Sequence, residues 1–424
     1  MKYPGQCRFG PETIPVRFPE AWPVETLVSP GLNPRGTDLE LVESALDNPI
    51  GSPRLGEIVG PGEEAVIVVS DLSRVWHRPA AFLPSLLGRL NRAGIGDEAI
   101  TILVATGTHL PHSEAEHRLV VGEEVFSRVR VVSHDCRDAA NLVEVGHTSS
   151  GRPVLINRLA VEAQRLILTG AITHHSLAGF AGGVKSILPG VAGLESIRAN
   201  HRLCLDSEGR IRPQVHEGAC PGNPVWEDMA AAAKLIRADF LLNVIVGGRG
   251  RYLAAVAGEP AGAHARGCAL AGQAFEVPLE GRADLVVASV GGAPRDAELF
   301  QSVKALSNAG AAAGEGGTII LASFCERGTG PEEWLDWFRL GSRERVVERL
   351  LTDFTIPGFV ALKVMDLARR CRLILVSSLN PETVRLCWME PASSLAQALA
   401  RVGGKTPQRV IWMPSASTTV PKAG

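Results

Sequence analysis

Short apolar runs that end in small or polar residues recur along the first half of the chain, and helical patterns follow at least the first two. The runs are rich in Val, Ile and Leu and end at Gly, Ser, Thr or Asp. Near-continuous apolar strands that alternate with helices are typical of a parallel sheet covered on both faces. We therefore predict an α/β fold here. The predicted strands are 64–71, 99–109, 129–135 and 165–175, and the predicted helices are 81–94 and 112–122.

The same alternation of apolar strands and helical patterns begins again after residue 280, which indicates a second domain. The stretch FEVPLEGRAD (275–284) interrupts the apolar pattern and marks the boundary. We predict two Rossmann-like α/β domains with parallel-rich sheets, residues 1–275 and 282–424, and an active-site cleft between them. The Pro-rich segment 1–50 is expected to be extended and to wrap the first domain. The second set of predicted strands is 283–292, 317–328, 371–380 and 408–417, with helices at 296–313 and 393–403.

Polar side chains follow the predicted strands of the first domain. Parallel sheets bind ligands at the carboxyl ends of their strands, so these side chains should lie near one rim. They are Asp71, Arg74, Thr106, His109, His174 and His175.

Composition and charge narrow the classes of partner. The chain has 424 residues, of which 45% are hydrophobic and 21% charged, and its formal net charge is -2. Such a balance gives no bulk electrostatic reason to bind nucleic acid or an anionic membrane, so neither partner is expected. The first residues do not resemble a secretory signal, and no apolar stretch approaches the roughly 20 residues of a membrane helix. The eight cysteines form no C-x-x-C pair. We therefore expect reduced thiols in a cytoplasmic protein.

The segment 172–203 holds the densest group of candidate functional residues. Its glycines allow the backbone to approach a ligand closely, and Lys185 lies among them. A lysine there can neutralise a phosphate, or act as a nucleophile if desolvation lowers its pKa. The sequence after Pro189 and Gly190 predicts a helix that carries His201.

Other interpretations of this segment require motifs that the chain lacks. A phosphate-binding P-loop needs Gly directly before the lysine, where this chain has Val184. A zinc hydrolase would show H-E-x-x-H, or H-x-E with C-x-x-C, and a dissociable nicotinamide would call for G-x-G-x-x-G after a strand; the sequence has none of these. Single histidines are most often structural. Four of them at loop-like positions make a purely structural explanation less favoured; they are His109, His174, His175 and His201.

Five motifs together resemble the nickel-pincer lactate racemase family. They occur in the family's order and spacing across residues 71–304, and the overall length is similar. The motifs are DLSR (71–74), which fits D-x-[ST]-R, ATGTH (105–109), HSLAGFAGGVKSILPG (175–190), ANH (199–201) and LFQSVK (299–304). The family has a two-domain α/β fold, in agreement with the strand and helix pattern.

The resemblance implies a nickel cofactor. In the family, a modified pyridinium mononucleotide holds nickel through carbon and sulfur atoms. The position of Lys185 implies covalent attachment of this nucleotide as a thioamide, and that of His201 implies the protein ligand to nickel. Sulfur and imidazole are suitable donors for nickel. Asp71, Arg74 and Gln301 are expected to contact the cofactor.

The resemblance also implies the reaction and its acid–base groups. His109 and His175 would be the acid–base pair, since the family spacing falls on His175 and leaves His174 a structural role. Arg74 or Lys304 would hold the substrate carboxylate. Inverting the α-carbon of a 2-hydroxy acid through a carbanion is disfavoured by the neighbouring carboxylate. Proton-coupled hydride transfer to the cofactor avoids that carbanion, and a histidine can take the hydroxyl proton near neutral pH.

We therefore expect a racemase or epimerase of lactate or a related small 2-hydroxy acid, served by cofactor-biosynthesis proteins. The alternative is a non-catalytic relative that binds a nucleotide or phosphate ligand, which would have no use for two acid–base histidines. Two departures from the family pattern leave the substrate open: Phe300 stands where the type member has Tyr, and Val75 stands where Pro is usual.

Overall fold

The computed structural model describes residues 2–148, 151–248, 250–402 and 406–423. The chain divides into two compact units: one comprises residues 31–274, and the other combines residues 275–424 with the segment up to Pro30. The first 30 residues thus group with the C-terminal half, although the sequence had suggested the first domain. The reason is strand pairing, because β3 (Val24–Thr26) pairs in parallel with β19 (Val410–Met413). Residues 2–18 are not a wrapping segment either, since β1 (Lys2–Phe9) and β2 (Glu12–Phe18) form an antiparallel hairpin.

A six-stranded sheet forms the centre of unit 31–274, in the order β13-β12-β9-β4-β5-β6. All neighbours are parallel except β12 and β13. The strands are β4 (Ala65–Ser70), β5 (Ile100–Ala105), β6 (Arg130–Ser133), β9 (Arg165–Ala171), β12 (Phe240–Val246) and β13 (Tyr252–Gly258). The first four are the strands predicted from the apolar runs, and the predicted α/β fold is confirmed.

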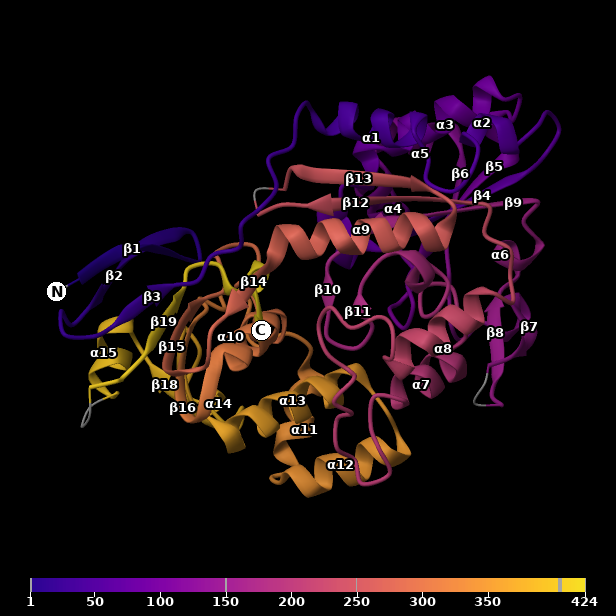
Figure 1. Ribbon diagram of the computed structural model, residues 1–424. Coiled ribbons are helices and arrows are strands. Elements are labelled where there is room, and N and C mark those ends of the chain that lie inside the picture. The colour runs from indigo at the N-terminus through magenta and orange to yellow at the C-terminus, as the bar shows by residue number, and fades with distance from the viewer. Residues whose placement is uncertain (1, 149–150, 249, 403–405, 424) are drawn as a thin grey trace. The chain divides into compact units, whose positions relative to one another are not determined.

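Helices cover both faces of this sheet. Leucines spaced along one side of α3 (Leu83–Arg92) and Val42 and Leu46 of α1 (Asp38–Asp47) are fully buried against the strands. Figure 1 shows α1 and α3 on one side of β12 and β13, with α9 (Pro260–Phe275) on the other. The remaining α-helices are α2 (Leu55–Ile58), α4 (Glu114–Val121), α5 (Glu123–Arg128), α6 (Arg158–Glu162), α7 (Leu194–Arg202) and α8 (Pro224–Ala233). Two small hairpins pair β7 (Leu142–His147) with β8 (Pro153–Asn157), and β10 (His174–His175) with β11 (Gly179–Phe180).

The strand order reverses beside β4, and this reversal places the candidate site. From β4 the chain adds β5 and β6 on one side, and then returns to add β9 and β12 on the other. At such a switch point the loops after the two central strands separate and leave a crevice for a ligand. The loops in question begin at Asp71 after β4 and at Ile172 after β9.

The second unit contains an all-parallel sheet in the order β18-β17-β16-β15-β19-β3. Its further strands are β15 (Ala283–Ser289), β16 (Ala313–Ala322), β17 (Arg372–Val376) and β18 (Glu390–Ala392), and β14 (Glu276–Leu279) pairs with β20 (Val420–Ala423). The predicted strands of this half are confirmed as β15, β16, β17 and β19. The helices are α10 (Leu299–Ala312), α11 (Glu332–Arg339), α12 (Arg343–Thr352), α13 (Ile356–Arg370), α14 (Pro381–Leu386) and α15 (Leu395–Ala400).

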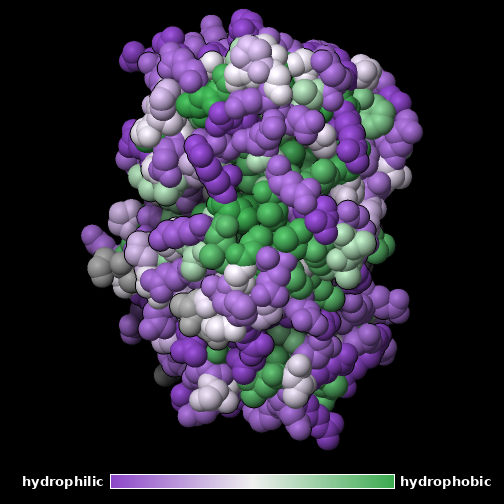
Figure 2. All heavy atoms as spheres, turned by 90° about the vertical axis from the view of Figure 1, so that its right-hand side faces the viewer, coloured by the Kyte–Doolittle hydropathy of each residue, from purple (hydrophilic) through white to green (hydrophobic). Residues whose placement is uncertain are grey.

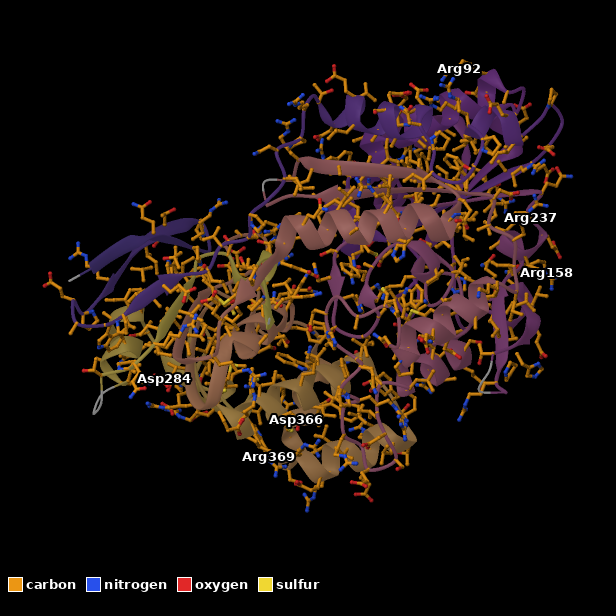
Figure 3. The ribbon with its side chains drawn as sticks, viewed as in Figure 1. Arg92, Arg158, Arg237, Asp284, Asp366 and Arg369 are labelled. Carbon is orange, nitrogen blue, oxygen red and sulfur yellow. The ribbon has the colours of Figure 1, made fainter. Side chains whose placement is uncertain are left out.

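The outer surface is mostly hydrophilic. Figure 3 shows charged side chains such as Arg92, Arg158 and Arg369 on the outside of helices, where all three are exposed. Several pair with acids one helical turn away, as Arg158 does with Glu162 at 3.0 Å, and such exposed pairs add little stability. Figure 2 shows a hydrophobic area bordered by hydrophilic side chains on one face. Among the described residues, no helix has both the length and the apolar character needed to cross a membrane.

Candidate active site

The loop after β4 holds a buried aspartate. β4 ends at Ser70, and the 3₁₀-helix η1 (Leu72–His77) follows Asp71. Ser73 Oγ donates a hydrogen bond to Asp71 Oδ1 at 2.7 Å, and His109 Nδ1 lies 2.6 Å from Asp71 Oδ2. Burial by itself would raise the pKa of Asp71, but the hydrogen bond and charge of His109, together with Ser73 and Arg74, lower it overall. Asp71 is therefore an ionised carboxylate despite being buried.

Asp71 orients the imidazole of His109, which follows β5. An ionised carboxylate can only accept, so His109 donates through Nδ1. In the neutral ring the proton then sits on Nδ1, and Nε2 keeps its lone pair. The His109 side chain is 56% exposed, so Nε2 remains open to a ligand. This geometry suits a general base.

His175 is held in the opposite tautomer by the β10–β11 hairpin. The backbone N–H groups of Leu177 and Ala178 both donate to His175 Nδ1, each at 3.2 Å. Because Nδ1 accepts, the neutral ring carries its proton on Nε2. Nε2 lies 3.1 Å from Lys185 Nζ. The proton on Nε2 requires a lone pair on Nζ, so this contact favours the neutral amine of Lys185.

The electrostatic surroundings of Lys185 favour the same state. Burial of the amine and then repulsion from Arg74 lower the pKa of Lys185 to about 7, against a weaker opposite effect of Cys220. Lys185 therefore presents a nucleophilic amine near neutral pH, which an ordinary lysine does not.

Lys185 lies in a tight turn that is held by a hydrogen bond to β12. The turn is the 3₁₀-helix η5 (Gly183–Ser186), and it begins after Gly182 at φ +77°. Asn243 Oδ1 accepts a hydrogen bond from Gly183 N at 2.9 Å. A Cβ on Gly182 would lie 2.5 Å from that same oxygen, so both the conformation and the space require glycine. The contact between the backbone of this turn and Asn243 therefore fixes the position from which the Lys185 side chain extends.

His201 lies in the last turn of α7 and is only 6% exposed. Burial, and then the charge of Lys185, lower the pKa of His201 to about 3. The imidazole is therefore neutral at physiological pH, as a metal ligand must be. Among the described residues, no group of three or more His, Cys, Asp and Glu side chains could hold a metal ion.

The structure brings the predicted residues of unit 31–274 together in pairs. Asp71 joins His109, and His175 joins Lys185, while Arg74 and His201 interact electrostatically with Lys185. His174 is buried and packs against Phe180, with ring centroids 4.6 Å apart.

Other predicted residues lie elsewhere. Thr106 is buried, and its hydroxyl donates to the carbonyl of His134 at 2.6 Å, so it supports the strand end. Gln301 and Lys304 lie in the first turns of α10 in the other unit, where Gln301 is exposed and Lys304 is partly buried. Phe300 precedes them and packs edge-on against Trp334 at 5.4 Å.

Sequence reasoning assigned no role to three supporting residues, although Ser73 is part of the DLSR motif. Ser73 and Asn243 position Asp71 and the lysine turn, and His112 Nε2 accepts a hydrogen bond from Leu72 N at 2.9 Å. The signal for Asn243 was present, because it is the one amide within the apolar run FLLNVIV (240–246). A polar residue in a buried strand needs a hydrogen-bond partner, and here the partner is the functional turn.

Comparison with known proteins identifies the family of the chain. The lactate racemase N-terminal domain matches residues 9–211, and the lactate racemase C-terminal domain matches residues 279–409. A lactate racemase of Thermoanaerobacterium thermosaccharolyticum is 35% identical over 366 residues, covering 85% of this chain and 84% of that protein. The chain belongs to the lactate racemase family. The family resemblance drawn from the motifs is thereby confirmed, and the protein is an isomerase of this family.

Further proteins are similar to this lactate racemase family member in sequence or in fold. The lactate racemase of Lactiplantibacillus plantarum is 35% identical over 379 residues, which cover 86% of each chain. The structure of the T. thermosaccharolyticum lactate racemase apoprotein superposes with a TM-score of 0.89 at 29% identity, over 98% of this chain and 99% of that one. A Thermotoga maritima protein, 18% identical with a TM-score of 0.66 over 92% of this chain and 98% of that one, shares the fold alone.

Proposed function

We propose that this enzyme inverts the α-carbon of a small 2-hydroxy acid with a nickel-pincer nucleotide attached to Lys185. The observation that carries the proposal is the contact between Lys185 Nζ and His175 Nε2 at 3.1 Å, in surroundings that lower the pKa of the amine to about 7. A neutral amine has the lone pair that forms a thioamide.

The residues present fit the proposed cofactor. Lys185 supplies the attachment point, and the neutral, buried imidazole of His201 suits nickel. Gln301 of α10 would contact the cofactor, and cofactor-biosynthesis proteins would have to supply it already assembled. When bound, the group would take up the α-hydrogen as hydride and return it.

His109 and His175 would handle the hydroxyl proton. His109 begins with a free lone pair on Nε2 because Asp71 occupies Nδ1, so it can accept the proton of the substrate hydroxyl. His175 begins with its proton on Nε2, so it can donate toward the oxygen of the flat 2-oxo acid. One acceptor and one donor are what inversion in a given direction requires.

Arg74 would hold the substrate carboxylate. Its charge acts on Lys185, which places the guanidinium near the reacting groups, and among the described residues its side-chain hydrogen bonds go only to Ser73. A guanidinium can bind a carboxylate through two parallel hydrogen bonds. Lys304 of α10 would be a second cation for the same group.

The substrate side chain would meet apolar groups. Val75, Trp76 and Leu110, which are next to Arg74 and His109 in sequence, are 41%, 40% and 76% exposed. Phe300 adds no hydroxyl. We therefore propose that 2-hydroxy acids with apolar side chains at least as large as that of lactate are turned over.

The test is racemisation of single enantiomers of 2-hydroxy acids by protein made together with the cofactor pathway. Interconversion of both enantiomers, lost in His109→Asn while the Lys185 adduct persists, is the expected result. Turnover by His109→Asn at the wild-type rate would exclude the proposed base. The matched control is His147→Asn, a solvent-exposed histidine of β7 in the same unit, which should leave the rate unchanged.

A further inference from the structure

Two cysteines from distant parts of the sequence meet beside the lysine turn. Cys220 lies in the loop before α8, and Cys268 lies on α9. The Cys268 thiol donates a hydrogen bond to Cys220 Sγ, and neither cysteine is in a disulfide. Cys220 is buried, whereas Cys268 is partly exposed. Cys268 is thus the more exposed residue of the pair.

Both cysteines also contact the backbone segment that carries the site, Cys220 directly and Cys268 through His264. Cys220 Sγ lies 3.6 Å from the carbonyl oxygen of Ala178, in the hairpin that fixes His175. Cys268 Sγ lies 3.6 Å from Nε2 of His264, and that same nitrogen is 3.1 Å from the carbonyl oxygen of Ala181.

His264 also packs closely on the lysine turn. A Cβ on Gly183 would lie 2.6 Å from the His264 ring. The backbone of residues 178–183 therefore contacts both the Cys220 loop and α9.

The two sulfurs differ in their readiness to react. The hydrogen bond from Cys268 lowers the pKa of Cys220, against the effect of burial, and the charge of Lys185 lowers it further. The same hydrogen bond, with burial, raises the pKa of Cys268. Because the thiolate is the nucleophile in thiol chemistry, Cys220 is the sulfur that reacts first.

We propose that Cys220 and Cys268 form a reversible disulfide that joins the Cys220 loop to α9 beside the lysine turn. With a peroxide as oxidant, the Cys220 thiolate attacks one peroxide oxygen, which gives a sulfenic acid and hydroxide. The Cys268 thiol then attacks the Cys220 sulfur, and the sulfenic oxygen leaves as water. In total, two thiols and one hydrogen peroxide give one disulfide and two waters, and a dithiol reverses the change.

The disulfide should restrain the segment that carries His175 and Lys185. With both anchors cross-linked, openings of residues 178–186 become less frequent. This effect is expected in protein without cofactor and rests on no step of the proposed reaction. A failed disulfide test would therefore leave the racemase proposal untouched, and the reverse is also true.

The experiment uses the wild-type protein made without the cofactor pathway. It is treated with limiting hydrogen peroxide, alkylated and digested with trypsin without reduction. Cys220 and Cys268 are each the only cysteine in tryptic peptides 211–234 and 267–282. The expected product is these two peptides joined, with a mass two hydrogen atoms below their sum, and separated again by dithiothreitol. Hydrogen–deuterium exchange of residues 178–186 should be slower in the oxidised protein.

Three single variants test which cysteines form the disulfide. Cys220→Ser and Cys268→Ser should each abolish the joined peptide, whereas Cys136→Ser, which removes another buried thiol of the same unit, should leave it. The proposal is overturned if wild-type Cys220 is oxidised to sulfinic acid without joining Cys268, or if it joins a different cysteine. Unchanged exchange of residues 178–186 after the disulfide has formed would overturn the restraint.

Discussion

The amine of Lys185 should be unusually reactive in the folded protein without cofactor. A pKa of about 7, instead of the 10.5 of an ordinary lysine, changes the protonation state of this amine at neutral pH. At pH 7 about half of the Lys185 amines are then neutral, against roughly one in three thousand for an ordinary lysine. Acylation by an amine-selective reagent should therefore be about a thousandfold faster than in an unfolded reference, if access is equal.

Replacing Arg74 by Met tests the cause of this shift. Arg74 repels the ammonium form, so its removal should raise the pKa of Lys185. Burial is the larger cause and is unaffected, so the pKa should remain below that of an ordinary lysine. We expect the midpoint of the rate-against-pH curve to move upward in Arg74→Met without reaching 10.5.

The assay is brief labelling between pH 5 and pH 11, with mass spectrometry of the peptide that contains Lys185. A synthetic peptide of residues 175–190 in the same tube is the reference for an ordinary lysine. A wild-type midpoint equal to that of the peptide would refute the electrostatic reasoning. A midpoint that does not rise in Arg74→Met would refute the role of Arg74.

Three further changes have defined outcomes. In Asp71→Asn the amide can donate to His109 Nδ1, which moves the imidazole proton to Nε2. The kcat for racemisation should therefore fall by roughly 10²–10⁴ while KM changes little. A loss of kcat/KM that comes from a higher KM with unchanged kcat would contradict the orienting role of Asp71. Asn243→Leu leaves Gly183 N–H without its acceptor, and urea unfolding should show a loss of about 1–3 kcal/mol. The pKa of Lys185 is lower in the folded chain than in the unfolded chain, so the unfolded chain binds the proton first as the pH falls from 10.5 to about 7. The free energy of unfolding therefore decreases over this pH range. Lys185→Met lacks this titration, so its free energy of unfolding relative to that of the wild type should be higher at pH 7 than at pH 10.5, as urea unfolding at the two pH values would show.

The apolar runs and the motifs predicted much of this molecule. The strands were readable because fully buried parallel strands are nearly continuous apolar runs, and polar residues such as Asp71 and His109 follow them at the rim. The motif around Lys185 also located the turn that the structure fixes with Asn243. These features are local in sequence, or they repeat a known spacing.

Long-range features could not be predicted in the same way. The pairing of β3 with β19 joins residues near opposite ends of the chain, and three residues of strand carry too little pattern to reveal a partner. The hydrogen bond between Cys220 and Cys268 likewise depends on how α9 packs, and cysteine spacing gives no sign of it. The tautomer of His109 likewise depends on Asp71, which lies 38 positions away in the sequence.

The mass of the Lys185 peptide, from protein produced together with the nickel-cofactor pathway, tests the central claim most directly. The account predicts a nucleotide-sized adduct on this lysine, which is absent in Lys185→Arg. An unmodified Lys185, in a host that loads another lactate racemase in parallel, would contradict the proposed attachment and the mechanism built on it.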